Sequence, residues 1–158
     1  MIQDARFQDD DDAPLRLIAQ DAPDLQVLAS LVQDAVFPIT DMTFAKRQHR
    51  FALLLNRFRW EDSPLAKRQG RPFERVRSLL VFETVLGVRS QNIDRSDTAS
   101  VLSLLSLTFT PNDTGGVVDL ILAGGSTIAL QVEALEATLT DVSRPYRANS
   151  GKAPVHNI

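Results

Sequence analysis

The segment that sets the architecture reads His49-Arg50-Phe51-Ala52-Leu53-Leu54-Leu55-Asn56-Arg57-Phe58-Arg59-Trp60-Glu61. In a strand, one side would carry Phe51, Leu53 and Leu55, and the other side would carry Ala52, Leu54, Phe58 and Trp60. Apolar side chains on both sides predict a central strand with apolar material packed against each face. Arg57 and Arg59 continue the first face as a cationic one, and packing alone gives no reason for that change.

Shorter strand-like runs surround this segment. They cover residues 15–18, 42–45, 75–83, 85–90, 101–110, 117–123 and 127–133. Gly124-Gly125-Ser126 predicts a hairpin turn between the last two runs. Residues 75–90 fit either two strands or one bent strand, and residues 134–142 fit either a helix or a bent continuation of the preceding strand. The polar stretches 61–72 and 91–99 predict loops.

One helix is predicted near the start of the chain. Asp21 is a suitable N-cap, and Pro23 fits the first turn, where no backbone N–H is missed. An apolar stripe at helical spacing follows, formed by Leu25, Leu28, Leu31, Val32 and Ala35. The helix is expected to end near Ala35, because Phe37 precedes Pro38 and such a residue favours extended backbone.

These elements predict an α+β fold: an N-terminal amphipathic helix with a large, mostly antiparallel sheet of about seven or eight strands, either barrel-like or in two layers. A pleckstrin-homology-like barrel is a rival, although that fold usually ends in a helix. Leu80–Val85 parallels Leu130–Leu135, which raises an internal duplication as a further interpretation. The expected organisation is a disordered acidic arm over residues 1–13, a single domain over 14–143 and a loose tail over 144–158.

The composition fits a soluble globular protein. Of the 158 residues, 44% are hydrophobic and 23% are charged, and the absence of cysteine excludes disulfides and cysteine-based metal sites. The first residues lack the basic and apolar regions of a signal peptide, and no apolar run approaches the ~18 residues of a membrane helix. We therefore expect a cytoplasmic protein with no membrane association.

Charge is distributed unevenly along the chain. Residues 1–45 hold nine acidic and two basic side chains, residues 46–77 hold three acidic and ten basic ones, and residues 78–158 hold eight acidic and five basic ones. A basic middle fits an anionic ligand or an acidic protein surface, but it equally fits internal neutralisation by an acidic arm lying across it. The sequence leaves both interpretations open.

The candidate site is an arginine-rich sheet face. Antiparallel pairing of residue 59 with residue 75 would place four arginines on it: Arg57, Arg59, Arg75 and Arg77. The loop between the two strands adds further candidates: Lys67, Arg68, Arg71 and, at its base, Trp60. Like charges directly opposite each other destabilise a sheet by up to ~1 kcal/mol per pair unless an anion lies between them. That anion would be a ligand, a partner's carboxylate, or an internal acid such as Glu61, Glu74 or the run Asp9–Asp12.

Other kinds of site have less support. Basic residues interleaved with Trp60 and Phe73 can hold single-stranded nucleic acid, but the pI of about 5.3 and the lack of a nucleic-acid motif argue against it. His49 has no second ligand at a metal-binding spacing. Glu133 and Glu136 have no acid–base partner near them in sequence. The sequence therefore predicts no catalytic residue, no cofactor and no metal site.

Three stretches carry a family resemblance. They are Leu15-Arg16-Leu17-Ile18-Ala19 with the helix after it, the run from Arg50 to Glu61, and Gly124-Gly125 leading into Ile128-Ala129-Leu130-Gln131-Val132-Glu133. Together they resemble a small bacterial family catalogued as domain of unknown function 2948, from about residue 14 to about residue 148. The resemblance implies a stand-alone cytoplasmic protein of alphaproteobacterial type, and it carries over no activity, ligand or catalytic residue.

The leading functional expectation is a non-catalytic binding or adaptor protein that uses the arginine face for an anionic ligand or acidic partner. The alternative is a hydrolase-like enzyme acting on an anionic small molecule, with weak nucleic-acid binding third. A deep pocket with a carboxylate beside Arg57 would favour the enzyme, whereas a flat apolar patch bordered by arginine would favour the adaptor. A long strand left at a sheet edge would also allow a homo-oligomer.

Overall fold

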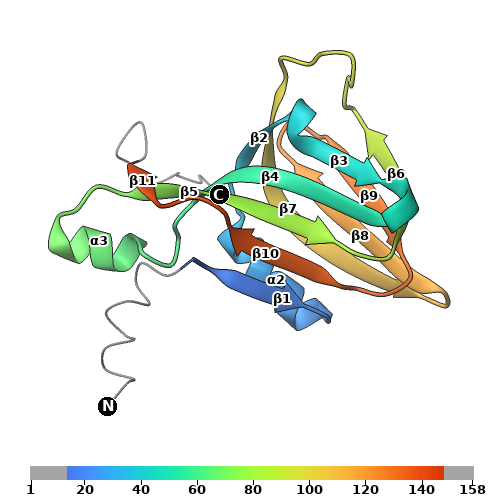
Figure 1. Ribbon diagram of the computed structural model, residues 1–158, viewed down its shortest axis with the longest axis horizontal. Helices are drawn as coiled ribbons and strands as arrows, with labels where there is room; N and C mark the ends of the chain where they lie inside the picture. The colour runs from blue at the N-terminus through green and yellow to red at the C-terminus, as the bar shows by residue number, and fades with distance from the viewer. Residues whose placement is uncertain (1–13, 148–158) are drawn as a thin grey trace.

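The computed structural model describes residues 14–147, which form an antiparallel sheet of eleven strands with two α-helices (Figure 1). The first elements are β1 (Arg16–Ala19), α2 (Ala22–Leu31), β2 (Val36–Pro38), η1 (Ile39–Asp41), β3 (Met42–Ala45) and η2 (Lys46–Gln48), the two η elements being 3-10 helices. The later elements are β4 (Arg50–Phe58), α3 (Ser63–Gln69), β5 (Glu74–Phe82), β6 (Val85–Gln91), β7 (Val101–Asn112), β8 (Gly115–Leu122), β9 (Thr127–Val132), β10 (Ala137–Asp141) and β11 (Tyr146–Arg147). The expected arm over 1–13, and 148–158 of the expected tail, lie outside the described residues.

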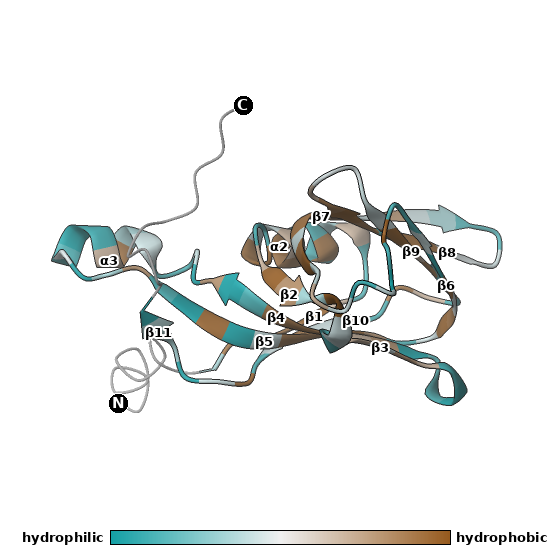
Figure 2. Ribbon diagram, turned by 90° about the horizontal axis from the view of Figure 1, so that it is seen from above, coloured by the Kyte–Doolittle hydropathy of each residue, from teal (hydrophilic) through white to brown (hydrophobic). Residues whose placement is uncertain are grey.

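The sheet folds over into two layers (Figures 1 and 2). We call β1, β10, β5, β4 and β3 the front layer, and β7, β8, β9 and β6 the back layer. β2 joins the layers along one side, because it pairs with both β4 and β7. The order of strands runs from β1 to β6 and those two strands do not pair, so the barrel-like alternative is wrong. The additional strands relative to the prediction are β2 and β11, and β10 corresponds to the strand alternative for residues 134–142.

Two bent segments join the layers along the opposite side. β5 leads into β6 through Glu83 and Thr84, and β9 leads into β10 through residues 133–136. The two segments pair with each other on both sides of the bend, β5 with β10 and β6 with β9. At the bend itself, the Glu83 N–H donates to the Glu136 carbonyl at 2.9 Å. The similar stretches around residues 80–85 and 130–135 both lie here, and the internal duplication stays a prediction.

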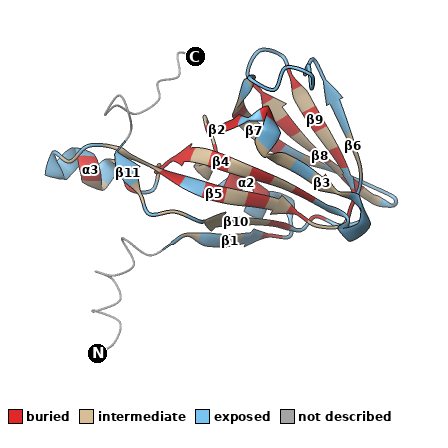
Figure 3. Ribbon diagram, turned by 45° about the horizontal axis from the view of Figure 1, so that its top comes forward, coloured by how far each residue is buried: buried red, intermediate tan, exposed pale blue. Residues whose placement is uncertain are grey.

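The core lies between the two layers (Figure 3). On β4, the exposed fractions of Phe51, Leu53 and Leu55 are 3%, 0% and 1%. Ala52 and Leu54, which alternate with them, are only half-buried. No element of residues 14–147 forms a layer over this outer side of the front layer (Figure 2). The prediction of apolar material packed on both faces of the strand is therefore wrong for the described part of the chain.

α2 packs against the core between β1 and β7. Its buried side chains, together with the residue that follows it, are Leu25, Leu28, Ala29 and Val32. Asp21 caps the helix, because its Oδ1 accepts a hydrogen bond from the Asp24 N–H at 2.8 Å. The helix ends at Leu31, earlier than expected, because Asp34 adopts a φ of 64° and β2 begins two residues later.

Three connecting segments test the predicted turns. The hairpin turn between β8 and β9 is confirmed, with φ of 81° at Gly124 and 78° at Gly125. The predicted loop over 61–72 contains α3, with Pro64 in its first turn and Gly70 at its end at φ 66°. β11 forms within the expected loose tail and pairs with β5. Neither helix between residues 14 and 147 has the length and apolar character needed to cross a bilayer.

Candidate functional site

The pairing of β4 with β5 determines which arginines share a face. Arg57 lies opposite Val76 rather than opposite residue 77, so the predicted register is wrong by one residue. A slip of one residue moves every side chain of a strand to the other face. Arg57 therefore lies on the inner face of the front layer, whereas Arg75 and Arg77 lie on the outer face. The four arginines do not form one surface.

The observed register has a packing reason. It places Phe51 opposite Phe82 and Leu53 opposite Leu80, and all four side chains are buried in the core. The predicted register would have placed Leu53 opposite Val81 instead, and Val81 is only half-buried. Large apolar side chains paired across the inner face bury more apolar area, and this favours the observed pairing.

The inner face ends in a buried ionic cluster. We call Arg57, Glu61, Ser78 and Asp141 the Arg57 cluster. The guanidinium of Arg57, which is 0% exposed, lies 2.8 Å from Glu61 Oε2 and 3.0 Å from Asp141 Oδ1. Its Nε donates to Ser78 Oγ at 3.0 Å, and the Ser78 hydroxyl donates to Asp141 Oδ1 at 2.6 Å. Two carboxylates and a hydroxyl thus occupy the donors of this arginine.

The Arg57 cluster connects distant parts of the chain. Asp141 ends β10, and its Oδ2 also accepts the N–H of Leu15 at 3.1 Å, just before β1. Ser78 lies on β5 and Arg57 on β4, so four neighbouring strands of the front layer meet at the cluster. A buried arginine that is fully paired and hydrogen-bonded is a structural tie rather than an available anion site.

The charges of the cluster shift two pKa values. Burial by itself would lower the pKa of Arg57, but the hydrogen bonds and charges of Glu61 and Asp141 outweigh it and raise that pKa. Burial would raise the pKa of Glu61, but the hydrogen bond and charge of Arg57 outweigh it and lower that pKa. Both shifts favour the charged forms at neutral pH.

A second ionic group holds the segment between β4 and β5. Arg59, 7% exposed, lies 2.6 Å from Glu74 Oε1 and 3.6 Å from Asp62 Oδ2. Arg71 binds the same Asp62 at 3.2 Å. Arg71 and Asp62 thus join the two ends of α3, and Arg59 links Asp62 to Glu74 at the start of β5.

Trp60 also has an internal role. Its ring packs edge-on against Phe58 at a centroid distance of 4.7 Å, and Phe73 packs against Phe58 from another direction at 5.8 Å. The indole N–H of Trp60 donates to the Gln33 carbonyl at 3.0 Å. Trp60 therefore fastens the end of β4 to the segment after α2.

The other predicted cations lie elsewhere. Lys67 and Arg68 are exposed on α3, which extends beyond the ends of β4 and β5 (Figure 1). Arg75 is half-buried and donates to the Asn56 carbonyl at 3.4 Å. Arg77 is exposed, and its side chain forms no hydrogen bond or ion pair within residues 14–147. The predicted site residues thus divide between internal ties and two separate surfaces.

The outer side of the front layer, which we call the front face, carries Arg75 and Arg77. Two cross-strand rows form its centre: Ile18, Thr138, Val81 and Ala52 in one, and Arg16, Thr140, Leu79 and Leu54 in the next. Ile18 is 53% exposed, and so is Val142 just past β10. Within the bounds of β1, β10, β5 and β4, this face carries no carboxylate.

A model of one protein family matches residues 15–156, which is nearly the whole chain; its description is protein of unknown function (DUF2948). The chain belongs to the DUF2948 family. No curated protein and no solved structure matches it. The family resemblance read from the sequence is confirmed, and the match runs to residue 156, beyond the expected end near residue 148.

In this DUF2948 protein, no three histidine, aspartate or glutamate side chains between residues 14 and 147 are grouped so that they could hold a metal ion. The sequence analysis named Glu61 and Glu74 among the acids that could neutralise the arginines. It missed Asp141, Asp62 and Ser78. The available signal was an aspartate at an inward position of an alternating run, Ala137-Thr138-Leu139-Thr140-Asp141, where a buried carboxylate needs a cationic partner.

A pH titration of stability tests the Arg57 cluster. Because the folded pKa of Glu61 is lowered, its stabilising effect is fully present above the unfolded pKa of about 4.3 and is lost as the pH falls through the lower folded value. We expect the Glu61→Gln variant to be less stable than the wild type at pH 7, by less than about 1 kcal/mol because the side chain is 33% exposed. The difference should shrink below pH ~4.3. Urea unfolding at several pH values measures it, and a difference that grows on acidification would contradict the assignment.

Proposed function

We propose that this DUF2948 protein is a non-catalytic binding or adaptor protein, and that its front face binds an acidic segment of another protein. One observation carries the proposal: an apolar sheet surface bordered by Arg16, Arg75 and Arg77, over which residues 14–147 place no layer. Exposed apolar patches with a polar border are typical of protein interaction sites. The cationic border favours a partner that combines apolar side chains with carboxylates.

The side chains of the front face suit such a partner. Leu54, Leu79 and Val81 are half-buried, so contact would remove their remaining apolar area from water. Arg16 and Arg77 form no ion pair within the described residues, and a guanidinium binds a carboxylate through two parallel hydrogen bonds. A second copy of this chain suits the face less well, because two-fold contact would bring arginines against arginines. A homo-oligomer formed through a long strand at a sheet edge stays a prediction.

The hydrolase alternative receives no support from Arg57. It required that arginine to hold an anionic substrate, but Glu61 and Asp141 already bind its guanidinium, and the side chain is 0% exposed. A flat apolar surface bordered by arginine was the feature expected of an adaptor. We therefore propose the adaptor and do not propose the hydrolase.

A titration with a model peptide tests the proposal. The ¹⁵N-labelled full chain is mixed with a decapeptide of glutamate and leucine, and with a control decapeptide of lysine and leucine. We expect the acidic peptide to shift the amide resonances of β1, β10, β5 and β4, and the basic peptide to shift none. Reversing two charges, by Arg16→Glu with Arg77→Glu, should weaken binding of the acidic peptide by about tenfold or more, because like charges would then meet.

Two controls separate the front face from general charge. Lys67→Glu with Arg68→Glu changes the net charge equally but lies on α3, and binding should stay within about twofold of wild type. If both double variants lose binding equally, net charge rather than the front face explains it. Changing Asp9–Asp12 to asparagine tests whether the chain's own acidic run competes for the face. Tighter peptide binding would indicate competition, and the partner would then have to displace that run.

A further inference from the structure

A cavity opens on the side of the molecule opposite the helix α2. β3 pairs only with β4, and β6 pairs only with β9, so each has a free edge within the described residues. A cavity of about 220 Å³ lies between the two layers here, lined by residues of both β3 and β6. Its walls come from both layers, from η1 and from the 92–100 loop between β6 and β7.

The inner part of the cavity is apolar. Seven of the eleven lining side chains are hydrophobic. Phe51 and Ile128 form buried parts of the lining at 3% and 1% exposure, whereas Met42, Phe44 and Val88 are half-buried around them. Partly exposed apolar side chains around a hollow gain from contact with an apolar ligand, and a methionine adapts its shape to different ligands.

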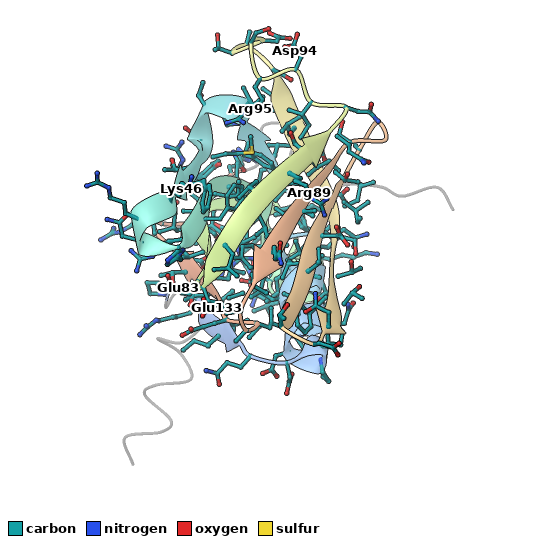
Figure 4. The ribbon with its side chains drawn as sticks, turned by 90° about the vertical axis from the view of Figure 1, so that its right-hand side faces the viewer. Lys46, Glu83, Arg89, Asp94, Arg95 and Glu133 are labelled. Carbon is teal, nitrogen blue, oxygen red and sulfur yellow. The ribbon has the colours of Figure 1, made fainter. Side chains whose placement is uncertain are left out.

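One end of the cavity is cationic. Arg95 lines the cavity, and the hydroxyl-bearing residues Thr40, Ser90 and Thr98 also belong to its lining. Figure 4 shows Arg95 near the top of this side of the molecule, whereas Glu83 and Glu133 lie near the bottom. Arg95 forms no ion pair within residues 14–147.

The adjacent acid does not neutralise Arg95. The carboxylate of Asp94 accepts hydrogen bonds from the backbone N–H and the hydroxyl of Ser96, at 3.0 and 2.5 Å. The guanidinium at the cavity is therefore available to an anion from outside the chain, and the nearby hydroxyl groups offer further donors.

We propose that this cavity binds a small amphipathic monocarboxylate, with its apolar part between β3 and β6 and its carboxylate at Arg95. A cavity of ~150 Å³ admits benzene, and pockets for drug-sized ligands begin near ~300 Å³. The observed 220 Å³ therefore suits a ring with a short side chain, or a short fatty acid. This site is separate from the front face and does not depend on the proposed adaptor role.

The test uses a matched pair of ligands, 3-phenylpropionate and its uncharged counterpart 3-phenylpropanol. Both are titrated into the full chain, and methyl and amide NMR shifts are recorded. We expect shifts at Met42, Val88 and Ile128 with both ligands, and a dissociation constant about tenfold lower for the acid, as a charge-assisted bidentate contact gives. Shifts confined to the front face, or no shifts at millimolar ligand, would overturn the proposal.

Three variants assign the roles. Arg95 lies on an exposed loop. The Arg95→Gln variant should bind 3-phenylpropionate only as weakly as 3-phenylpropanol, and its affinity for the alcohol should be unchanged. Arg89→Gln removes the same charge from β6 outside this cavity, and it should leave the affinities for both ligands unchanged. Val88→Trp fills the cavity and should abolish binding of both ligands, with its amide spectrum serving as the folding check. Equal loss in Arg95→Gln and Arg89→Gln would contradict an Arg95 site. Arg16→Glu with Arg77→Glu should bind the acid normally, which separates this site from the front face.

Discussion

The Asp141→Ala variant is expected to lower the free energy of unfolding by about 3 kcal/mol, near the lower end of what breaking a buried ion pair costs. It leaves Arg57, which is 0% exposed, with one carboxylate instead of two, and it removes the acceptor of the Ser78 hydroxyl and of the Leu15 N–H. Burying donors without partners adds to the lost attraction. Glu61 remains beside Arg57 and keeps the cost from being larger.

Urea unfolding gives the measurement, and Glu136→Ala gives the matched control. Glu136 is an exposed carboxylate just before the same strand, and its loss should cost less than about 0.5 kcal/mol. A second comparison uses Arg57→Met with Asp141→Leu, which replaces the pair by apolar side chains. This double variant should be more stable than the sum of the single effects predicts. An Asp141→Ala cost below about 1 kcal/mol would show that the cluster is not a stabilising tie.

The Gly115→Ala variant is expected to lose about 3 kcal/mol of stability, for a reason of backbone geometry rather than charge. Gly115 has a φ of 135°, where residues with a side chain are strained. A Cβ atom there would collide with the backbone carbonyls of Val132 and Glu133. Those carbonyls lie where β9 enters the bend and cannot turn aside as a side chain can, since the Glu133 N–H is bound to the Thr84 carbonyl.

Thermal unfolding followed by circular dichroism compares this variant with Gly87→Ala. A Cβ at Gly87 would meet nothing within 4 Å, and its φ is not positive, so its melting temperature should stay within about 2 °C of wild type. A loss of ~3 kcal/mol in a protein of this size corresponds to a fall of roughly 6–12 °C. Equal changes in the two variants would mean that the collision at Gly115 is relieved by local movement.

The central strand could be predicted from the sequence, whereas its partners' alignment could not. Phe51, Leu53 and Leu55 alternate as inner residues should, and they are buried. The run Leu79-Leu80-Val81-Phe82 is apolar at every position, so alternation gives no preference between two registers. What decides between them is packing between distant side chains and the contact of Arg57 with Asp141, which lies 84 residues away.

The sites were partly predictable for the same reason. The basic middle of the chain was evident, and internal acids were one of the two explanations that the sequence left open. Arg57, the candidate on which the predicted site depended most, forms an ion pair with an acid of the same chain. Arg16, Arg75 and Arg77 share the front face only because of the order of the strands in the sheet. The cavity was invisible in the sequence, because its walls come from β3, β6 and a polar loop that are brought together only by folding.

The pairing of β1 with β10 also determines when the sheet can be completed during synthesis on the ribosome. Within residues 14–147, β1 is the earliest strand and pairs only with β10, and the bond from Leu15 to Asp141 spans 126 residues. Contacts of such separation form late and slow the folding of sheet proteins. β1 therefore cannot pair until β10 has been synthesised. A nascent chain that stops before Ala137 contains every apolar residue of β1 but lacks the strand with which β1 pairs.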